Sequence, residues 1–257
     1  MLDRVTAKAG QYPEEYYDDE LNARLDEIPT LTDQLDAGGH LQISREAVVA
    51  ANPDLVIGHT DTINPQTMQA SSIPTLVEPA LCGHLDGNAS FEDVYDQVRL
   101  YGTVFGREDV AEDTVADLRA QVDELTERVP ADEERTVAVL YPTVGGGVTY
   151  AYGTGSMSHP VVEAAGLTNV FADQNERVFE VSGEELIGRN PDVILALYSE
   201  GDPDAVADAV TNLPGAEAVT AVQDQAVVPM LMNYAEPPTL LAVEGLEMLV
   251  DYLEQTR

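Results

Sequence analysis

Tyrosine, histidine and arginine side chains offer the clearest chemistry in this sequence. The chain has no tryptophan, so a large planar ligand would have to be held by tyrosine or histidine rings, which combine a stacking face with a polar atom. The tyrosines available for stacking or phenolate contacts are Tyr12, Tyr16, Tyr17, Tyr150, Tyr152 and Tyr234. Each of them also fits the plainer interpretation of half-buried packing.

Arg177 is the cation that we single out. Lys and Arg number 12 in the chain, against 47 Asp and Glu. An arginine can bind a carboxylate or phosphate group of a ligand through two parallel hydrogen bonds. An ion pair with one of the many surface carboxylates is the alternative interpretation of Arg177.

The four histidines suggest a second chemistry, direct binding of zinc or manganese. His40, His59, His84 and His159 could supply imidazole ligands. His159 precedes a proline at a predicted helix start, which favours a structural role. Cys82 is the only cysteine, so the sequence excludes an internal disulfide and a cysteine-based zinc cage.

A glycine-rich segment, GTGSMS at residues 153–158, suggests a nucleotide-dependent enzyme. It carries the first two glycines of a dinucleotide-binding fingerprint, and Asp173 follows about twenty residues later. The third glycine is absent and the motif comes late in its lobe. We therefore keep this enzyme as the less favoured alternative and expect no catalytic site.

A duplicated segment predicts the elements that position these residues. Residues 44–58 (SREAVVAANPDLVIG) and 182–196 (SGEELIGRNPDVILA) share a serine, a glutamate and an Asn-Pro-Asp run at the same places. The serine can cap a helix, and Asn-Pro ends it. The aliphatic run that follows is typical of a parallel strand buried on both faces. Each copy therefore predicts a helix and then a core strand.

The duplication favours two lobes. We predict an α/β fold with two Rossmann-like lobes that contain parallel sheets and are joined by a long backbone helix. Residues 1–90 form the first lobe, truncated at its start. Residues 91–129 show helical periodicity with an interruption near Gly106, and residues 130–257 form the second lobe.

The net charge of −35 limits the possible partners and source. No cluster of Lys and Arg supplies the basic surface that nucleic acids need. Hydrophobic residues make up 44% of the chain, which indicates a folded core under an acidic surface. One lysine, Lys8, and an excess of carboxylates resemble proteins of salt-loving archaea. No apolar run approaches the ~20 residues of a membrane-spanning helix.

The order of these motifs resembles the helical-backbone solute-binding proteins of ABC transporters, the family that delivers iron-siderophores, haem and cobalamin. The resemblance runs from Asp3 to Leu253 and includes both repeats, the segments FGREDVAEDTVADLRAQVDELTERV and HPVVEAAGLTNVFAD, and VVPMLMNY. Family members carry a strand, a helix and a lipoprotein or Tat export signal that should precede residues 2–5. We expect that these are missing here because the start codon was assigned late.

In such a fold the ligand lies beyond the carboxyl ends of the strands. This selects residues 10–17, His40, residues 59–61 and 78–84 in the first lobe, and residues 141–152, Arg177, Tyr198 and residues 232–236 in the second. The ligand-binding residues expected from this placement are His40, His59, Tyr12, Tyr150, Tyr152, Arg177 and Tyr234.

The resemblance implies further roles. His40 and His59 match positions where aromatic rings pack on the corrin of cobalamin, while Val178 replaces a third such ring. Glu46 and Glu184, at equivalent places in the two repeats, match the glutamates that dock on arginines of the membrane permease. Favourable interaction with a helix dipole is the structural alternative for both.

We therefore expect an extracellular, membrane-anchored monomer that captures a metal chelate between its lobes and delivers it to an ABC permease and its ATPase. An iron-siderophore is the first choice, followed by cobalamin and haem. No intrinsic cofactor or resident metal is expected. The zinc- or manganese-binding protein remains an alternative.

Overall fold

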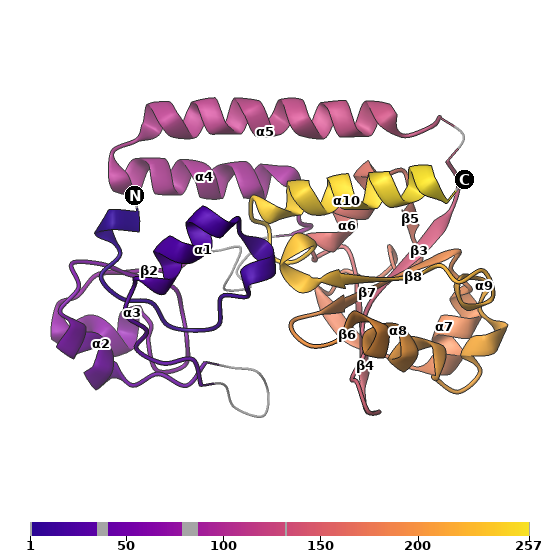
Figure 1. Cartoon of the computed structure of the whole chain (residues 1–257), viewed down its shortest axis with the longest axis horizontal. Helices are drawn as coiled ribbons and strands as arrows, with labels where there is room; N and C mark the ends of the chain where they lie inside the picture. Colours follow the sequence, from indigo (N-terminus) through magenta and orange to yellow (C-terminus); the bar gives the residue numbers. More distant parts are fainter. Residues whose placement is uncertain (1, 35–40, 79–86, 132, 257) are drawn as a thin grey trace. The chain divides into compact units, whose positions relative to one another are not determined.

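Two compact units make up the chain in the computed structural model, which describes residues 2–34, 41–78, 87–131 and 133–256 (Figure 1). The first unit is Met1–His84 and the second is Leu85–Arg257. Residues 91–129, expected to connect two lobes, belong to the second unit. None of the described helices combines the length and hydropathy that a bilayer-spanning segment requires.

The first unit contains a short parallel sheet. Its strands β1 (Val56–Ile57) and β2 (Thr75–Leu76) pair in parallel, as the two strands predicted there should. The helices are α1 (Asp19–Asp26), α2 (Arg45–Ala51) and α3 (Pro65–Met68), with 3-10 turns η1 (Leu2–Arg4), η2 (Glu14–Tyr16) and η3 (Gln69–Ser71). Val48 of α2 packs with Ile63 and Met68 in the small core of this unit.

The second unit is built on a larger mixed sheet. Its strands lie in the order β6 (Val178–Val181), β4 (Thr149–Tyr152), β3 (Thr136–Tyr141), β7 (Val193–Tyr198) and β8 (Val227–Leu231), and β5 (Thr168–Asn169) also pairs with β3. β3, β5, β7 and β8 are parallel, whereas β4 is antiparallel to both of its neighbours. The expectation of parallel sheets is corrected at β4, because a strand that follows β3 through a short hairpin must run antiparallel.

Helices cover both faces of this sheet (Figure 1). On one side lie α4 (Phe91–Phe105), α5 (Glu108–Arg128), α6 (Ser158–Ala164) and α10 (Leu241–Gln255); on the other lie α7 (Gly183–Arg189), α8 (Pro203–Thr211) and α9 (Thr220–Gln223), with η4 (Ala216–Ala218) before α9 and η5 (Met232–Tyr234) after β8. Side chains alternate along a strand, so the two faces of the sheet have separate cores. Val193 and Leu195 of β7 belong to the core that includes residues of α5, α6 and α10. Ile194 and Ala196 belong to the core that includes residues of α7, α8 and α9.

The duplicated segment forms the elements that it predicts in both units. The hydroxyl oxygens of Ser44 and Ser182 accept hydrogen bonds from backbone N–H groups in the first turns of α2 and α7. Both helices end at an asparagine in the left-handed conformation, Asn52 with φ 48° and Asn190 with φ 45°. The residue before a proline avoids the right-handed helical region, so the Asn-Pro pair ends each helix at the same point.

The two copies differ in how deeply their strands are buried. The six residues of β7 are buried except at its end, as predicted, because β3 and β8 flank it and helices cover both faces. The same prediction for the first copy is wrong. Ile57 of β1 is 41% exposed, because β1 has β2 as its only neighbouring strand among the described residues.

The helical segment 91–129 is two helices that are separated near Gly106, which corrects the expectation of one long backbone helix. α4 ends at Gly106, which adopts a left-handed conformation with φ 62°, and α5 begins at Glu108. The two helices lie antiparallel and side by side (Figure 1). Their apolar faces contribute Val94, Val115 and Leu118 to the core of the second unit.

Candidate functional site

The carboxyl edge of the second sheet carries a chain of polar contacts. β3 and β7 end at Tyr141 and Tyr198, and β8 is followed by Met232. The Tyr141 hydroxyl donates to Ser199 Oγ at 3.1 Å, and the Ser199 hydroxyl donates to Met232 Sδ at 3.7 Å. Three strand ends that are far apart in sequence are thus tied together at the edge where a ligand of an open parallel sheet would lie.

Tyr150 lies at this same edge. It is in register with Tyr141 across the β3–β4 hairpin and is 37% exposed. Thr143 Oγ1 donates to the carbonyl of Val148 at 2.6 Å and so closes the loop of this hairpin. Tyr234, in η5, is half-buried. Both predicted tyrosines therefore present part of their surface to solvent.

Tyr152 is placed differently from Tyr150. Although it lies two residues further along β4, it is 3% exposed and belongs to the main core of the second unit. Burial raises the pKa of its phenol; Glu236 raises the pKa further, and Arg177 opposes this rise. Tyr152 therefore stays protonated and neutral and offers almost no surface for stacking.

We expect this raised pKa to make the protein lose stability in alkali. The folded protein holds the phenol proton where the unfolded chain releases it, so the stabilisation is complete below about pH 10 and is lost as the pH rises further. Between about pH 9 and about pH 11, the free energy of unfolding measured with urea should fall less for Tyr152→Phe than for the wild type. Equal losses would mean that the Tyr152 phenol does not contribute.

Arg177 forms an ion pair with Glu236, and its backbone carbonyl accepts from the N–H of Gly153, just past the end of β4 that lies away from Tyr150. Arg177 Nη1 donates to Glu236 Oε1 at 2.8 Å. The other carboxylate oxygen of Glu236 accepts from the backbone N–H of Met157 at 2.8 Å and from Ser156 Oγ at 3.2 Å. Glu236 is 1% exposed, whereas the Arg177 side chain is 44% exposed. A buried carboxylate is thus paired with an arginine that still reaches solvent.

The surface ion pair considered for Arg177 is corrected, and ligand binding by Arg177 stays a prediction. Arg177 is ion-paired, but its partner is a buried carboxylate and not one of the many at the surface. Burying a charge requires compensation by an opposite charge and hydrogen bonds, and Glu236 has both. Sequence reasoning named residues 232–236 only as a loop and missed this function of Glu236, since no local pattern shows that a carboxylate will be buried.

The glycine-rich segment GTGSMS is explained by packing. A Cβ atom on Gly153 would lie 2.6 Å from the carbonyl oxygen of Glu176, and one on Gly155 would lie 3.0 Å from that of Asn175. The backbone N–H of Thr154 donates to the Gln174 carbonyl at 2.9 Å. These glycines let the loop lie against the segment that leads to Arg177. The dinucleotide-binding interpretation loses its main support.

In the first unit, Tyr12 is a half-exposed candidate contact. Burial raises the pKa of Tyr12, and Tyr17 and Glu78 raise it further. Lys8 Nζ lies 5.2 Å from the centre of the Tyr12 ring and donates to a backbone carbonyl of α1 at 2.8 Å. His59 follows β1 and is exposed.

The described residues give no support to a zinc or manganese site. They contain no group of three or more His, Cys, Asp or Glu side chains arranged to hold a metal ion. His159 is buried at the start of α6, with Nε2 3.5 Å from Glu163 Oε1. His40 and His84, two of the histidines considered, lie outside the described residues.

Glu46 and Glu184 occupy equivalent places in the two units. Each is the second residue of its helix, α2 or α7, and each is exposed. The Glu46 carboxylate lies 3.9 Å from the Arg45 guanidinium, an exposed pair. Both carboxylates are therefore accessible on their own unit.

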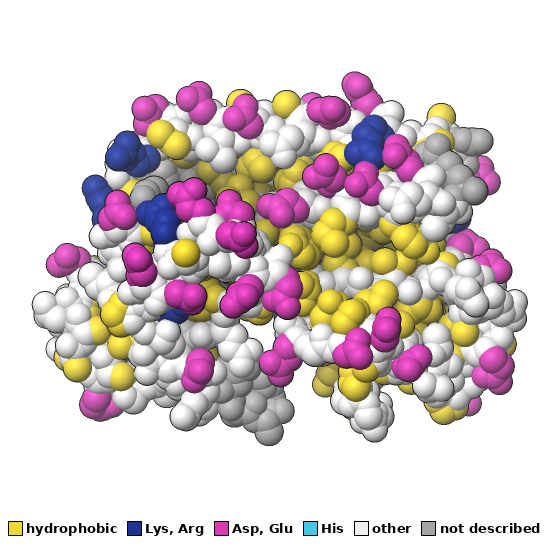
Figure 2. Space-filling view, viewed as in Figure 1, with side chains coloured by type: hydrophobic (Ala, Val, Ile, Leu, Met, Phe, Trp, Pro, Cys, Tyr) yellow, Lys and Arg dark blue, Asp and Glu magenta, His cyan; other side chains and the backbone are white. Residues whose placement is uncertain are grey.

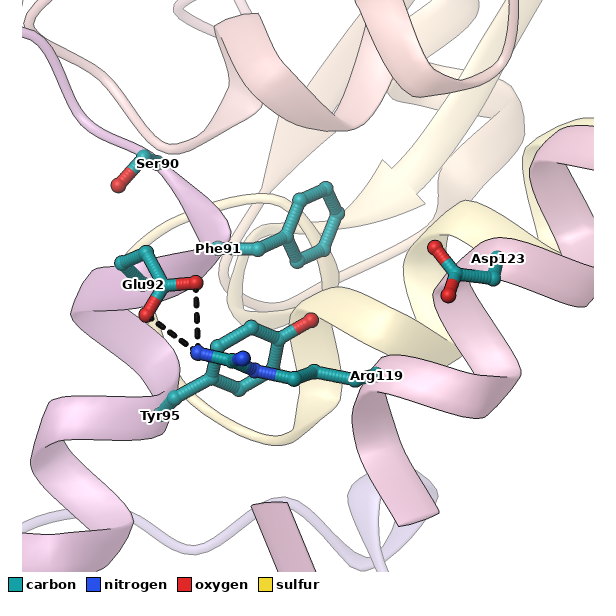
Figure 3. A pocket seen from close by; sticks show the side chains of 6 residues that line it. All are labelled: Ser90, Phe91, Glu92, Tyr95, Arg119 and Asp123. Atoms are coloured by element: carbon teal, nitrogen blue, oxygen red, sulfur yellow. Dashed lines mark hydrogen bonds and ion pairs between the residues drawn. The ribbon is translucent and has the colours of Figure 1, made fainter. Parts of the chain in front are cut away.

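A surface depression of about 370 Å³ lies on α4 and α5 of the second unit (Figure 3). Arg119 Nη2 donates to both carboxylate oxygens of Glu92, at 2.8 and 2.7 Å, and its guanidinium lies 4.9 Å from the centre of the Tyr95 ring. The arginine is thus already paired. The lining residues are Ser90, Phe91, Glu92, Tyr95, Arg119 and Asp123.

Comparisons with known proteins agree with this architecture. A family model described as "Periplasmic binding protein" matches residues 3–230. The uncharacterized ABC transporter substrate-binding lipoprotein YvrC of Bacillus subtilis (strain 168) is 24% identical over 231 residues, which are 86% of this chain and 69% of that protein.

Solved structures extend the likeness over nearly the whole chain. An ABC-type Fe3+-hydroxamate transport system protein from Saccharomonospora viridis DSM 43017 is 49% identical to this chain, with a TM-score of 0.89. The match covers 96% of this chain and 85% of that one. The periplasmic heme-binding protein RhuT from Roseiflexus sp. RS-1 is 20% identical, with a TM-score of 0.69 over 91% of this chain and 86% of its own. At that identity it shares the fold alone. The two-lobed α/β fold is thereby confirmed.

Proposed function

Since this chain belongs to the periplasmic binding protein family, we propose that it is the substrate-binding component of an ABC importer and that its ligand is a ferric hydroxamate chelate. The observation that carries this proposal is the 49% identity, over 96% of the chain, to the Fe3+-hydroxamate transport system protein of Saccharomonospora viridis. Capture and delivery need no covalent step, so no residue is assigned a catalytic role.

The second unit offers groups that suit such a ligand. Hydroxamate oxygens accept hydrogen bonds, and Tyr150 and the exposed part of Arg177 carry donors for them. Tyr234 can add an aromatic surface for the alkyl arms of the chelate. His59 and Tyr12 are the proposed contacts of the first unit, and His40 stays a further prediction outside the described residues.

The rest of the proposal concerns delivery. The chain would act as a monomer outside the cell membrane, anchored as the Bacillus relative is by its description as a lipoprotein. Its partners would be a permease and an ATPase, with Glu46 and Glu184 as the docking residues. The excess of carboxylates also supports an origin in a salt-loving organism, where high ionic strength screens their repulsion. Haem and cobalamin rank below a hydroxamate because the heme-binding protein noted above supports the fold alone.

Direct titration tests the proposed ligand. The chain has 11 tyrosines and no tryptophan, so quenching of tyrosine fluorescence by an iron chelate can report binding. We expect saturable binding of ferrioxamine B in about 1 M NaCl. A chelate concentration of about one hundred times Kd should raise the free energy of unfolding by about 3 kcal/mol. The iron-free hydroxamate is the control and should bind more weakly. Saturation by hemin or zinc, without any response to ferric hydroxamates, would contradict the proposal.

A further inference from the structure

Eight of the ten arginines in the described part of the chain form ion pairs. Figure 2 shows Asp and Glu side chains spread over the visible face and few Lys or Arg among them. The ion-paired arginines are Arg24, Arg45, Arg99, Arg119, Arg128, Arg135, Arg177 and Arg189. A free positive charge is therefore scarce on this surface, and the charge at the candidate site depends on the pair of Arg177 and Glu236.

The carboxylate that neutralises Arg177 is buried in the protein. Glu236 is buried and cannot turn outward, and its second carboxylate oxygen is held by the Met157 N–H and the Ser156 hydroxyl. Its negative charge is thus fixed 2.8 Å from Arg177 Nη1. The exposed part of Arg177 can donate hydrogen bonds to a ligand oxygen, but the pair as a whole attracts no anion.

The other charged groups around the proposed contacts do not restore a positive field. Glu180 is exposed on β6 and lies in register with Tyr150 of β4. In the first unit, the carboxylate of Glu78 contributes to raising the pKa of Tyr12. Lys8 is the cation near Tyr12, and it is already engaged with the Tyr12 ring and a backbone carbonyl. The charged residues named here, all in the described part of the chain, therefore give the proposed contacts of each unit neutral or negative surroundings.

We propose that the site takes ferric trihydroxamates whose net charge is zero or positive, and that Glu236 sets this preference by neutralising Arg177. This inference rests on the proposed function and names its ligand class more closely. The three hydroxamate anions cancel the charge of Fe3+, so the chelate core is neutral. Catecholate and carboxylate chelates keep a net negative charge, which the paired Arg177 cannot compensate and which nearby carboxylates repel.

A charge series on one iron centre tests the preference. Ferrioxamine B carries a free ammonium group, its N-acetyl derivative is neutral, and its N-succinyl derivative ends in a carboxylate. Dissociation constants would be measured in about 1 M NaCl, where the screening length is about 3 Å and the net charge of the protein contributes little. We expect the first two to bind within a few-fold of each other and the N-succinyl derivative to bind about tenfold more weakly, which is about 1.4 kcal/mol.

The Glu236→Gln variant tests the role of the carboxylate. The amide keeps an acceptor for Met157 but leaves the charge of Arg177 unbalanced. The penalty on the N-succinyl derivative should shrink to about twofold or less. Glu254→Gln is the control, since it also removes one carboxylate that contacts an arginine, Arg128, which Asp251 contacts as well. That variant should keep the wild-type order of affinities.

Three results would count against the inference, and they are distinguishable. Tight binding of the N-succinyl derivative by the wild type would overturn the charge preference, and this measurement does not depend on any variant folding. An unchanged penalty in a folded Glu236→Gln protein would overturn the role of Glu236. Failure of all three chelates to bind would overturn the proposed function itself, and the inference with it.

Discussion

Uptake is expected to fall at least tenfold when Glu46 and Glu184 are both replaced by arginine, while the affinity for the ferric chelate stays unchanged. Both carboxylates are exposed at the second position of equivalent helices, α2 and α7. If they pair with permease arginines, two arginines in their place would meet like charges, which cost several kcal/mol at an interface. Transport of a radioactive iron chelate into cells that carry the importer, with fluorescence titration of the purified variant, measures both quantities.

A matched double variant separates docking from net charge. Glu20 and Glu108 are also exposed glutamates in the first turns of helices, α1 and α5, one in each unit. Glu20→Arg with Glu108→Arg changes the charge by the same amount and should transport normally. Normal uptake by the Glu46 and Glu184 variant would reject the docking assignment. A parallel loss of chelate affinity would instead assign these glutamates to ligand binding.

Gly245→Ala is expected to destabilise the second unit by about 1–3 kcal/mol, the range for overpacking a tight contact. Gly245 lies in α10, where an added Cβ would overlap the backbone carbonyl of Tyr234. The methyl group would force η5 away from the helix, and with it the predicted ligand contact at Tyr234. Urea unfolding in molar salt should therefore show a lower midpoint, and chelate affinity should fall as well.

Gly188→Ala is the control for this prediction. Gly188 also lies within a helix, α7, but an added Cβ there meets no atom within 4 Å. Alanine is favoured over glycine inside a helix by about 0.5–1 kcal/mol, so this variant should be as stable as the wild type or more so. The two substitutions are chemically identical, but they should change the free energy of unfolding in opposite directions. Equal stability of both variants would show that η5 does not pack on α10 as described.

The repeated segment shows how far local rules extend. Its serine caps, its Asn-Pro helix ends and its aliphatic strands formed as predicted in both units, because each depends on residues a few positions apart. The burial of the strands did not follow from the same pattern. β7 has a neighbour on each side and β1 has one among the described residues, and the number of neighbouring strands is not encoded within the segment.

The candidate residues lie on the expected strands only in part. Tyr150 was expected in the loop after the strand 136–141, and it lies on β4, in register with Tyr141 at the carboxyl edge. Tyr152, two residues away on the same strand, is buried in the core. The motif GTGSMS suggested a nucleotide, yet its glycines serve the close packing of residues 153–155 on residues 174–176. Glycine spacing predicts that another group lies close to the backbone, but it does not show whether that group is a ligand or another segment of the chain.

The sequence by itself determined the family, the α/β class, the paired helix-strand units and the segments that carry the candidate ligand contacts. These follow from capping, proline sterics and hydrophobic periodicity, all of which act over short distances. Only the tertiary structure decided the partner of Arg177, since Glu236 lies in a different segment and becomes buried where it meets Ser156 and Met157. Burial fixes a charge beside the arginine, and burial is a property of the folded chain as a whole.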